Sequence, residues 1–302
     1  MVRMKVRDVV CSFLVVCVVW QVTLIVIELK DLFVGIDFNL NENVSCFNGS
    51  SSRIPRIIHQ MWKDNNLSTY PIKHSHNKWK LLYPNFTVRL WTDAHLQQLP
   101  NFNEYRHLKS IYDSYSYSIQ RADLGRLLIL HHAGGIYADL DVFPNSNQLE
   151  CLLLTNSSFY APRSSSGNSL INHFLISEKN SSILTFILHQ IKRKHFYEKI
   201  YLLPYLQVFS TGSFFLTKSV HKYFHLNPTN ELETKILSER NLLIYVTHEQ
   251  GRSWHLIDGF ILNLVEDHKK NFLTILTFLL FLVLLFVRYR YVLLIKIQKL
   301  SQ

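Results

Sequence analysis

Charge is missing from two stretches of this 302-residue chain. Residues 9–27 hold no charged side chain between Asp8 and Glu28, and residues 271–287 hold none between Lys270 and Arg288. A membrane-spanning helix needs roughly 20 predominantly apolar residues. The first stretch has that length, and the second is slightly short but fits a thin secretory membrane. We therefore expect an uncleaved transmembrane anchor at 9–27 and a transmembrane helix at 271–287.

Each stretch also has another interpretation. The first could be a cleaved signal peptide, although its apolar core is longer than the roughly 7–15 residues typical of one, and no clear small-residue cleavage site follows it. The second could be a buried core helix, because its apolar residues lie on every side.

The formal net charge of +10 lies largely at the two ends of the chain. Residues 1–8 carry a net charge of +2, and residues 288–302 carry four basic side chains and no acid. Basic residues favour the cytosolic side of a membrane, so both ends are expected in the cytosol and residues 28–270 in the lumen of the Golgi or endoplasmic reticulum. A basic, aromatic-rich face is not evident, so no nucleic-acid partner is expected.

Cysteine is scarce, with four residues in the chain. Two lie in the first apolar stretch, which leaves Cys46 and Cys151 to form a disulfide in an oxidising lumen or to remain free thiols. The N-glycosylation sequons agree with a lumenal location, because all six fall between the two apolar stretches. Their asparagines are Asn43, Asn48, Asn66, Asn85, Asn156 and Asn180.

No internal repeat is apparent, and the length between the spans suits one domain of about 220 residues. The expected plan is a cytosolic N-terminus at 1–8, the anchor at 9–27, a stem at 28–52, a lumenal α/β domain at 53–270, the second span at 271–287 and a cytosolic tail at 288–302.

The central stretch 119–143, IQRADLGRLLILHHAGGIYADLDVF, predicts a helix, a glycine break and a strand. Four residues recur at helical spacing, namely Leu124, Leu127, Leu128 and His131. Gly134 and Gly135 supply the stop, because glycine adopts left-handed backbone angles without a Cβ clash. The apolar run that follows predicts a buried strand ending in Asp139-Leu140-Asp141, closed by Pro144.

The two carboxylates in this buried strand need a partner. Burying an isolated carboxylate costs about 5 kcal/mol unless a cation compensates for its charge. Asp139 and Asp141 share strand parity and are expected to point the same way. Such an all-oxygen pair suits Mn²⁺ or Mg²⁺, which keeps coordination positions open for phosphate oxygens.

The elements that precede this stretch indicate an α/β fold with a mostly parallel sheet. Strands are predicted at 57–62 and 86–91, and a helix at 74–83. Farther along the chain, helices are expected to open at 168–173 and at 211–213 and to cover 181–197, and strands are expected at 159–162 and 242–247. In open sheets of this kind the ligand lies at the carboxyl ends of the strands, where Asp139 and Asp141 are placed.

The segments RIPRIIHQMW and RADLGRLLILHHAGGIYADLDV resemble the DXD-containing sugar transferases of glycosyltransferase family 32. The likeness covers roughly residues 53–145. It combines D-x-x-R, G-G-x-Y and D-x-D at fixed spacing, a pattern far more specific than D-x-D alone. The resemblance implies a GT-A-like nucleotide-sugar-binding fold. In overall plan the chain is most similar to the inositol-phosphoceramide mannosyltransferases, which also carry a hydrophobic segment after the catalytic domain.

The resemblance also implies roles for individual residues near the two motifs. Asp123 and Arg126 would be catalytic and hold the donor sugar and diphosphate. Arg121 and Tyr137 would be further donor-binding residues. Asp139 would contact the metal, the ribose or the donor sugar.

Three more implied roles lie elsewhere. Asp141 would ligate the metal, and Trp62 would stack on the nucleotide base. His255, or Ser253 with Trp254, would close over the diphosphate, and His255 is a candidate metal ligand. Thr211-Gly212-Ser213 departs from the Thr-Gly-Pro common in the family, which leaves the acceptor side open.

The implied reaction is metal-dependent transfer of a hexose with retention of configuration. The implied donor is GDP-mannose, with UDP-galactose second, and the acceptor is a membrane lipid such as inositol phosphoceramide, with a possible regulatory membrane subunit. An α-galactosyltransferase or an N-glycan α-1,6-mannosyltransferase of the same family is the alternative.

Plainer interpretations remain for these residues and for the whole chain. Asp123 and Arg126 could be a simple helix pair, Trp62 could be plain core, and His255 a hydrogen-bonded loop histidine. The chain could also be a catalytically silent membrane partner. A metal-dependent phosphohydrolase is the third class, but Phe143-Pro144 stands where such an enzyme needs serine or threonine.

Overall fold

The computed structural model describes residues 19–20, 52–70, 73–164, 169–198, 211–227 and 233–249, all in the first of the two units into which the chain divides, Met1–Gly251. The predicted span at 271–287 and all but two residues of the predicted span at 9–27 lie outside the described residues. Within the part of the chain that the structure describes, no helix combines the length and apolarity needed to cross a membrane.

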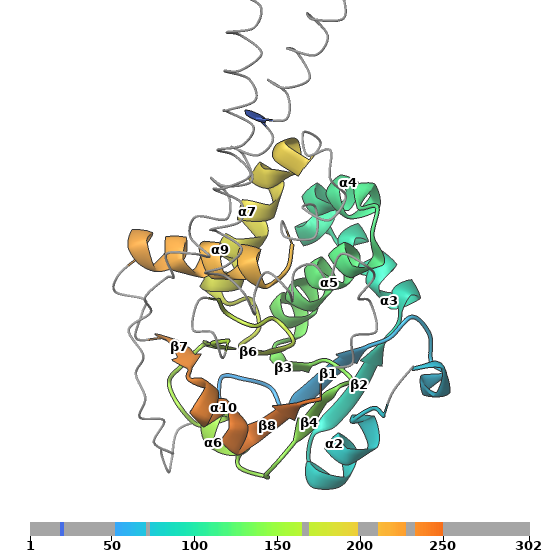
Figure 1. Cartoon of the computed structure of the whole chain (residues 1–302), viewed down its shortest axis with the longest axis vertical. Coiled ribbons are helices and arrows are strands. Elements are labelled where there is room, and N and C mark those ends of the chain that lie inside the picture. Colours follow the sequence, from blue (N-terminus) through green and yellow to red (C-terminus); the bar gives the residue numbers. More distant parts are fainter. Residues whose placement is uncertain are drawn as a thin grey trace, which may run out of the picture. The chain divides into compact units, whose positions relative to one another are not determined.

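A six-stranded mixed sheet forms the centre of the domain, with the strand order β2-β1-β3-β6-β5-β7 (Figure 1). Strands β2, β1 and β3 are mutually parallel, β6 is antiparallel to β3 and β5, and β5 is parallel to β7. The prediction of a mostly parallel sheet is therefore confirmed for the half of the sheet that leads to Asp139. The strands are β1 (Ile57–Met61), β2 (Thr87–Trp91), β3 (Gly135–Ala138), β5 (Phe159–Pro162), β6 (Phe174–Ser177) and β7 (Thr234–Leu237).

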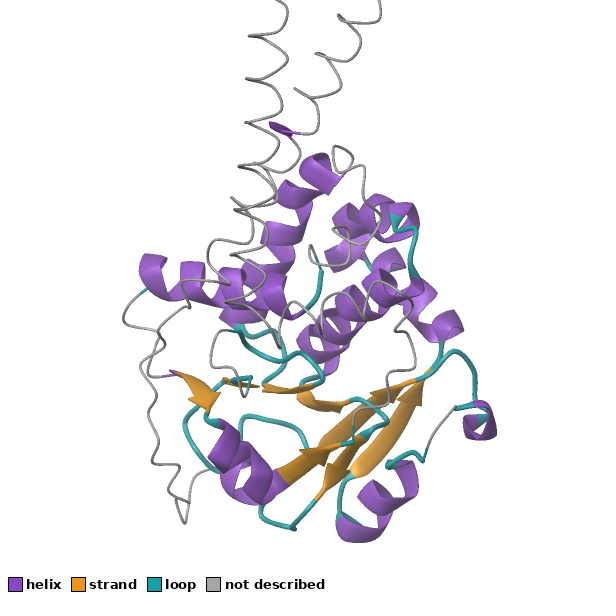
Figure 2. Cartoon of the chain, viewed as in Figure 1, coloured by secondary structure: helices purple, strands orange, loops and turns teal. Residues whose placement is uncertain are grey.

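Helices cover both faces of this sheet (Figure 2). One face carries α3 (Asp93–Gln98), α4 (Arg106–Ser114), α5 (Ser118–Ala133), α7 (Ser182–Glu198) and α9 (Ser213–Leu226). The other carries α2 (His76–Leu82), α6 (Leu149–Leu153), α10 (Glu239–Tyr245) and a two-stranded ribbon of β4 (Val142–Pro144) and β8 (Val246–His248). Short 3₁₀ turns lie at Leu67–Thr69, Leu99–Asn101 and Asn103–Tyr105.

Two hydrophobic cores follow from this layering, and strand alternation assigns residues to them. Ile136 and Ala138 of β3 belong to the core under α2, α6 and α10, while Tyr137 between them belongs to the core under α5 and α7. All three side chains are almost fully buried. Successive side chains of a strand point to opposite faces, so the short β3 is shielded from water on both sides.

The junction between α5 and β3 depends on the glycine pair, as predicted. Gly134 and Gly135 have φ angles of 65° and 105°, and a Cβ on Gly135 would lie 2.5 Å from the carbonyl oxygen of Ile57. Gly134, with ψ of −176°, occupies a backbone region essentially reserved for glycine. The helix can therefore end abruptly and send the chain directly into a buried strand.

The acidic pair does not lie in a strand, contrary to the sequence prediction. Asp139, Leu140 and Asp141 form a turn between β3 and β4, closed by the hydrogen bond from the Val142 amide to the Asp139 carbonyl at 3.0 Å. The apolar run from Ile136 to Phe143 is split because β3 pairs with the main sheet and β4 pairs with β8 in a separate ribbon.

Two further secondary-structure predictions are wrong. The described part of 168–173 is a loop leading into β6, whose Phe174–Ser177 segment is fully buried between β3 and β5. Most of 242–247 is the end of helix α10, and its last two residues begin β8. The helix is favoured because the Ser238 hydroxyl caps it by accepting from the Asn241 amide, and Leu242 and Tyr245 pack into the core.

Several other predictions are confirmed. The positions of β1, α2, β2, β5 and α7 match the predicted segments, and α9 begins at Ser213. The sequence left open whether Cys151 is paired or a free thiol; in the structure it is disulfide-bonded, and the other three cysteines of the chain lie outside the described residues.

Candidate active site

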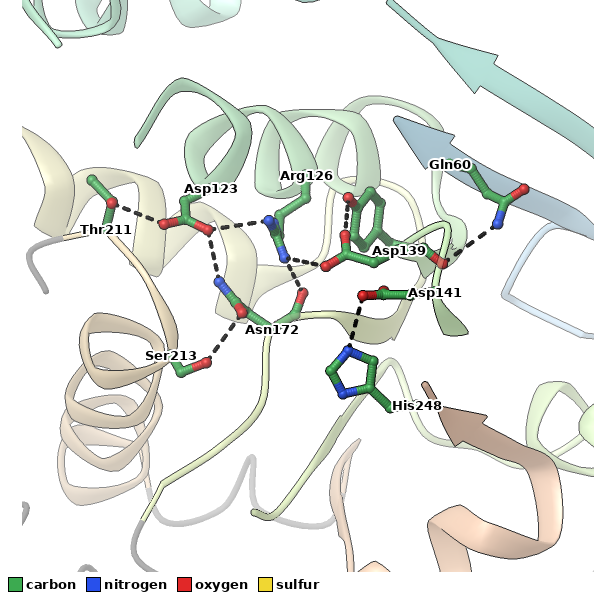
Figure 3. Close-up of polar contacts among 10 residues, drawn as sticks. Gln60, Asp123, Arg126, Asp139, Asp141, Asn172, Thr211, Ser213 and His248 are labelled. Atoms are coloured by element: carbon green, nitrogen blue, oxygen red, sulfur yellow. Dashed lines mark hydrogen bonds and ion pairs between the residues drawn. The ribbon is translucent and has the colours of Figure 1, made fainter. Parts of the chain in front are cut away.

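Asp123 and Arg126 form a buried ion pair on α5, the helix that leads to the acidic turn (Figure 3). The Arg126 Nη2 atom lies 3.2 Å from Asp123 Oδ1, and the two side chains are 5% and 4% exposed. Asn172 Nδ2 donates to Oδ1 at 2.9 Å, and Thr211 Oγ1 donates to Oδ2 at 3.0 Å. Burial raises the pKa of Asp123 to about 6, although Arg126 and Thr211 oppose the rise.

Arg126 connects this pair to the acidic turn. Its Nη1 donates to the Asn172 carbonyl at 2.8 Å and approaches Asp139 Oδ2 at 3.5 Å, and its guanidinium lies 5.1 Å from the ring centroid of Tyr137. Burial alone would lower its pKa, but Asp139, Tyr137 and Asp123 raise it. Arg126 is therefore a fixed cation. Its buried Nε–H has no hydrogen-bond partner among the described residues.

Asp139 is held by hydrogen bonds of its side chain and its backbone, and part of its side chain is exposed to solvent. The Tyr137 hydroxyl donates to its Oδ1 at 2.5 Å, and its backbone amide donates to the His173 carbonyl at 2.9 Å. Its side chain is still 30% exposed. Burial raises the pKa of Asp139, Arg126 opposes the rise, and the carboxylate of Asp141 adds to it. The two carboxylates are therefore close enough to repel each other.

Asp141 is approached by a histidine that the sequence did not single out. His248 Nε2 lies 3.3 Å from Asp141 Oδ2, and the His248 ring stacks on His173 with centroids 3.9 Å apart. Burial lowers the pKa of His173 to about 3, so this ring is neutral. Figure 3 shows the carboxylates of Asp139 and Asp141 extending from the turn to the side where Arg126 and His248 lie. The turn, and not strand parity, gives them this common direction.

The loop before β6 and the start of α9 complete the cluster. Ser213 Oγ donates to Asn172 Oδ1 at 3.1 Å, so the hydrogen bonds run from α9 through Asn172 to Asp123. Thr211 therefore contacts Asp123 directly, and Ser213 is linked to it through Asn172. Asn172 and His173 were missed because their segment was predicted as a helix, and His248 because local sequence does not indicate its contact with Asp141.

The remaining predicted site residues lie elsewhere or are not described. Trp62 follows β1 at the same sheet edge as Asp139, is partly buried, and donates from Nε1 to Thr69 Oγ1 at 2.7 Å. Arg121 donates to the Tyr115 carbonyl and lines a polar cavity of about 590 Å³ between α3 and α4, so its described contacts are separate from those of Asp123. His255, Ser253 and Trp254 lie outside the described residues.

The chemistry of the cluster suits a divalent cation. Three aspartates and one arginine leave two uncompensated negative charges when all are ionised. Within the described ranges, no three His, Cys, Asp or Glu side chains gather closely enough to hold a metal by themselves. Asp139 and Asp141, with His248 nearby, therefore fit an open site in which a bound phosphate supplies further oxygens.

Comparison with known proteins assigns the chain to a class of enzymes. The model of a family described as "Glycosyltransferase sugar-binding region containing DXD motif" matches residues 71–159, which include Asp123, Arg126, Asp139 and Asp141. The Schizosaccharomyces pombe protein named inositol phosphoceramide mannosyltransferase 3 is 31% identical over 266 residues, which are 83% of this chain and 69% of that protein. The chain therefore belongs to the DXD-containing glycosyltransferases of family 32.

Further relatives in this family have closely related names. Inositol phosphoceramide mannosyltransferase 1 of Schizosaccharomyces pombe is 28% identical over 74% of this chain and 70% of its own length. Mannosyl phosphorylinositol ceramide synthase SUR1 of Saccharomyces cerevisiae is 29% identical over 71% of this chain and 55% of its own length. Among solved structures, PaToxG glycosyltransferase aligns with 59% of this chain and 73% of its own at 18% identity and a TM-score of 0.42, too low to support a conclusion.

Proposed function

We propose that this glycosyltransferase is a metal-dependent, retaining enzyme that moves a hexose, with mannose favoured, from a nucleotide sugar to a membrane glycolipid such as inositol phosphoceramide. One observation carries the proposal. The buried Asp123–Arg126 pair and the Asp139–Asp141 turn converge beyond the carboxyl end of β3, which is where an open α/β sheet binds its ligand.

The charge of the cluster supports the nucleotide-sugar chemistry. Its two uncompensated negative charges match one Mn²⁺ or Mg²⁺, held by Asp139 and Asp141. Such a cation supplies Lewis-acid stabilisation of the charge that grows on a departing diphosphate. His255 remains a proposed additional metal ligand. His248, which lies beside Asp141, is a second candidate ligand among the described residues.

Arg126 would act on the leaving group. Two carboxylates and the Asn172 carbonyl fix its guanidinium, while its buried Nε–H has no partner among the described residues and is available to a phosphate or sugar oxygen. A donor fixed before the reaction costs no reorganisation when charge develops, which favours the transition state over the ground state. Asp123 would hold Arg126 and contact the sugar, while Tyr137 would keep Asp139 oriented through its hydroxyl group.

We name no covalent nucleophile. Retention is proposed to proceed on one face of the sugar, with the leaving phosphate helping to deprotonate the acceptor hydroxyl. Trp62 is proposed to stack on the nucleotide base, since it follows β1 at the ligand edge of the sheet and is partly exposed. Arg121 also remains a proposed donor-binding residue, although its described contacts are separate from those of Asp123.

The substrates and location are inferred from the relatives and the sequence. The relatives' names mention mannosyl transfer and inositol phosphoceramide, so GDP-mannose is the favoured donor and UDP-galactose the second. The spans proposed at 9–27 and 271–287 would place the domain in the Golgi or endoplasmic reticulum lumen beside a lipid acceptor, with a regulatory membrane subunit possible. The four described sequon asparagines are all exposed, which is compatible with glycosylation in that lumen.

The test is a panel of nucleotide sugars with Mn²⁺, scored for donor hydrolysis and for transfer to inositol phosphoceramide. We expect GDP-mannose to give the highest transfer. Hydrolysis of simple phosphate monoesters without sugar transfer would indicate a phosphohydrolase. Inactivity toward every donor would indicate a silent partner.

A substitution tests the metal assignment separately. Asp141→Ala is expected to abolish transfer while the protein still folds and traffics, because the carboxylate proposed to bind the cation is gone. Glu150→Ala is the control, since Glu150 is a largely exposed carboxylate on α6 that is paired with Arg56. Undiminished transfer by Asp141→Ala would reject the assignment.

A further inference from the structure

The acidic turn is fixed through its backbone by segments that are distant in sequence. All three residues of the turn have backbone hydrogen bonds to such segments. The bonds run from the Asp139 amide to the His173 carbonyl at 2.9 Å, from the Ser75 amide to the Leu140 carbonyl at 2.7 Å, and from the Glu249 amide to the Asp141 carbonyl at 2.9 Å. The direction of both carboxylates therefore depends on where these segments hold the turn.

One side chain joins the turn and one of these segments, the stretch Ser75–His76, to an interior strand of the sheet. Gln60 lies near the end of β1 and is fully buried. Its Nε2 donates to Ser75 Oγ at 2.9 Å and to the Asp139 carbonyl at 3.5 Å, the latter drawn in Figure 3. Its Oε1 lies 2.8 Å from His76 Nδ1. Both amide hydrogens and the carbonyl oxygen are thus used.

These contacts determine the orientation of the groups involved. An amide whose nitrogen faces a backbone carbonyl must present its oxygen to His76, so His76 carries a proton on Nδ1 and donates it. Burial lowers the pKa of His76 to about 4, so the ring is neutral and this arrangement holds at neutral pH. Leucine or methionine could fill the volume of Gln60, but neither could make the three hydrogen bonds.

Strand β1 is held by neighbouring strands on both of its sides. It is paired in parallel with β2 over five residues and with β3 on its other side. The turn itself follows a strand of four residues and precedes one of three. A hydrogen bond from β1 therefore ties the position of the turn that carries the acids to that of the sheet.

We propose that Gln60 is a positioning residue for the cation and diphosphate site, acting through the backbone of the Asp139–Asp141 turn and through Ser75. The inference rests on the proposed function, because it concerns the same site. Groups that orient metal ligands without touching the metal typically alter affinity by about 10- to 100-fold when replaced. Gln60 is placed to have such an effect on both carboxylates at once.

The experiment measures Mn²⁺ binding directly in the detergent-solubilised full chain. Free Mn²⁺ is followed by electron paramagnetic resonance in the presence of GDP and, separately, UDP. Gln60→Leu is compared with the wild type and with Gln120→Leu. Gln120 is a matched control, because it is also a glutamine, is 1% exposed, and caps the start of α5 by accepting from the Tyr117 amide.

Gln60→Leu is expected to raise the Kd for Mn²⁺ about tenfold or more. Saturating Mn²⁺ is expected to restore most of kcat for donor hydrolysis, which a general loss of folded protein would not allow. Gln120→Leu is expected to keep the wild-type Kd. Ser75→Ala is a milder change that removes one partner of the Gln60 amide, and it is expected to raise the Kd by a smaller factor. This variant replaces Gln60→Leu in the test if Gln60→Leu does not fold.

Three results would overturn the proposal, and they are distinguishable. Wild-type Mn²⁺ affinity in Gln60→Leu, or in Ser75→Ala if the first variant does not fold, would refute the role of Gln60 and leave the proposed function intact. An equal loss in Gln120→Leu would show that any buried glutamine has this effect. If the wild type bound no Mn²⁺ with either nucleotide, the metal dependence in the proposed function would fail, and the inference with it.

Discussion

His59 gives the structure a pH dependence that can be calculated and tested. It lies on β1, is 0% exposed, and joins two elements: its Nε2 donates to the Gly134 carbonyl at 2.8 Å, and its Nδ1 accepts from Trp91 Nε1 at 3.0 Å. A protonated ring has no acceptor nitrogen, so it would lose the Trp91 bond. Burial lowers the pKa of His59 to about 4 from 6.5, with the Gly134 carbonyl partly opposing.

The sign of the effect follows from proton linkage. Because the folded pKa is lower than the unfolded one, the unfolded chain binds the proton first as pH falls. The stability that neutral His59 contributes is fully present above pH 6.5 and is lost as pH falls toward 4. Between pH 7 and pH 5 the loss is about 2 kcal/mol, and over the whole window it is about 3 kcal/mol.

The measurement is urea unfolding of the wild type and of His59→Gln at pH 7 and pH 5. Glutamine can donate to Gly134 and accept from Trp91 but does not titrate in this range. The wild type is expected to lose about 2 kcal/mol more than the variant over this interval, since other ionisable groups contribute equally to both. Parallel losses in the two proteins would refute the assignment of His59 as a buried neutral ring.

Three other predictions concern the site, the glycine junction and the tail. Arg126→Lys should lower donor hydrolysis about 100-fold, because an ammonium cannot reproduce the guanidinium fork; an unchanged rate in a hydrolysis assay would contradict its role. Gly135→Ala should lower the melting temperature by about 5 °C or more, because its Cβ would meet the Ile57 carbonyl, whereas Gly125→Ala meets a flexible side chain; equal melting temperatures would contradict this. Removing 271–302 should preserve donor hydrolysis and weaken transfer to lipid, and undiminished lipid transfer would count against a membrane-held acceptor.

The sequence predicted local elements well where periodicity and glycine agreed. Helix α5, its stop at Gly134 and Gly135, and the strands β1 and β2 were all expected from patterns within a few residues. Such patterns are reliable because side-chain direction in a helix or strand follows directly from residue spacing. The D-x-x-R and D-x-D motifs likewise placed Asp123, Arg126, Asp139 and Asp141 in one candidate site before the fold was known.

The wrong secondary-structure predictions concern segments in which tertiary contacts override the local preference of the residues for helix or strand. The segment 242–247 is rich in residues that favour strands, yet packing of Leu242 and Tyr245 keeps most of it helical. The acids were assigned to a strand because sequence cannot show that β3 and β4 pair with different sheets. The wrong helix at 168–173 hid Asn172 and His173 for a related reason, since the pairing of β6 with β3 and β5 is not local.

The sequence by itself determined the family, the acidic and basic residues of the candidate site, and the helix and strand that carry them to one sheet edge. Only the tertiary structure decided which groups surround them, because Gln60, Asn172, Thr211 and His248 come from four other segments of the chain. Residue spacing fixes the direction of a side chain along its own element. The folding of distant elements against each other fixes which atoms it meets, and hence the charge and hydrogen bonding of the site.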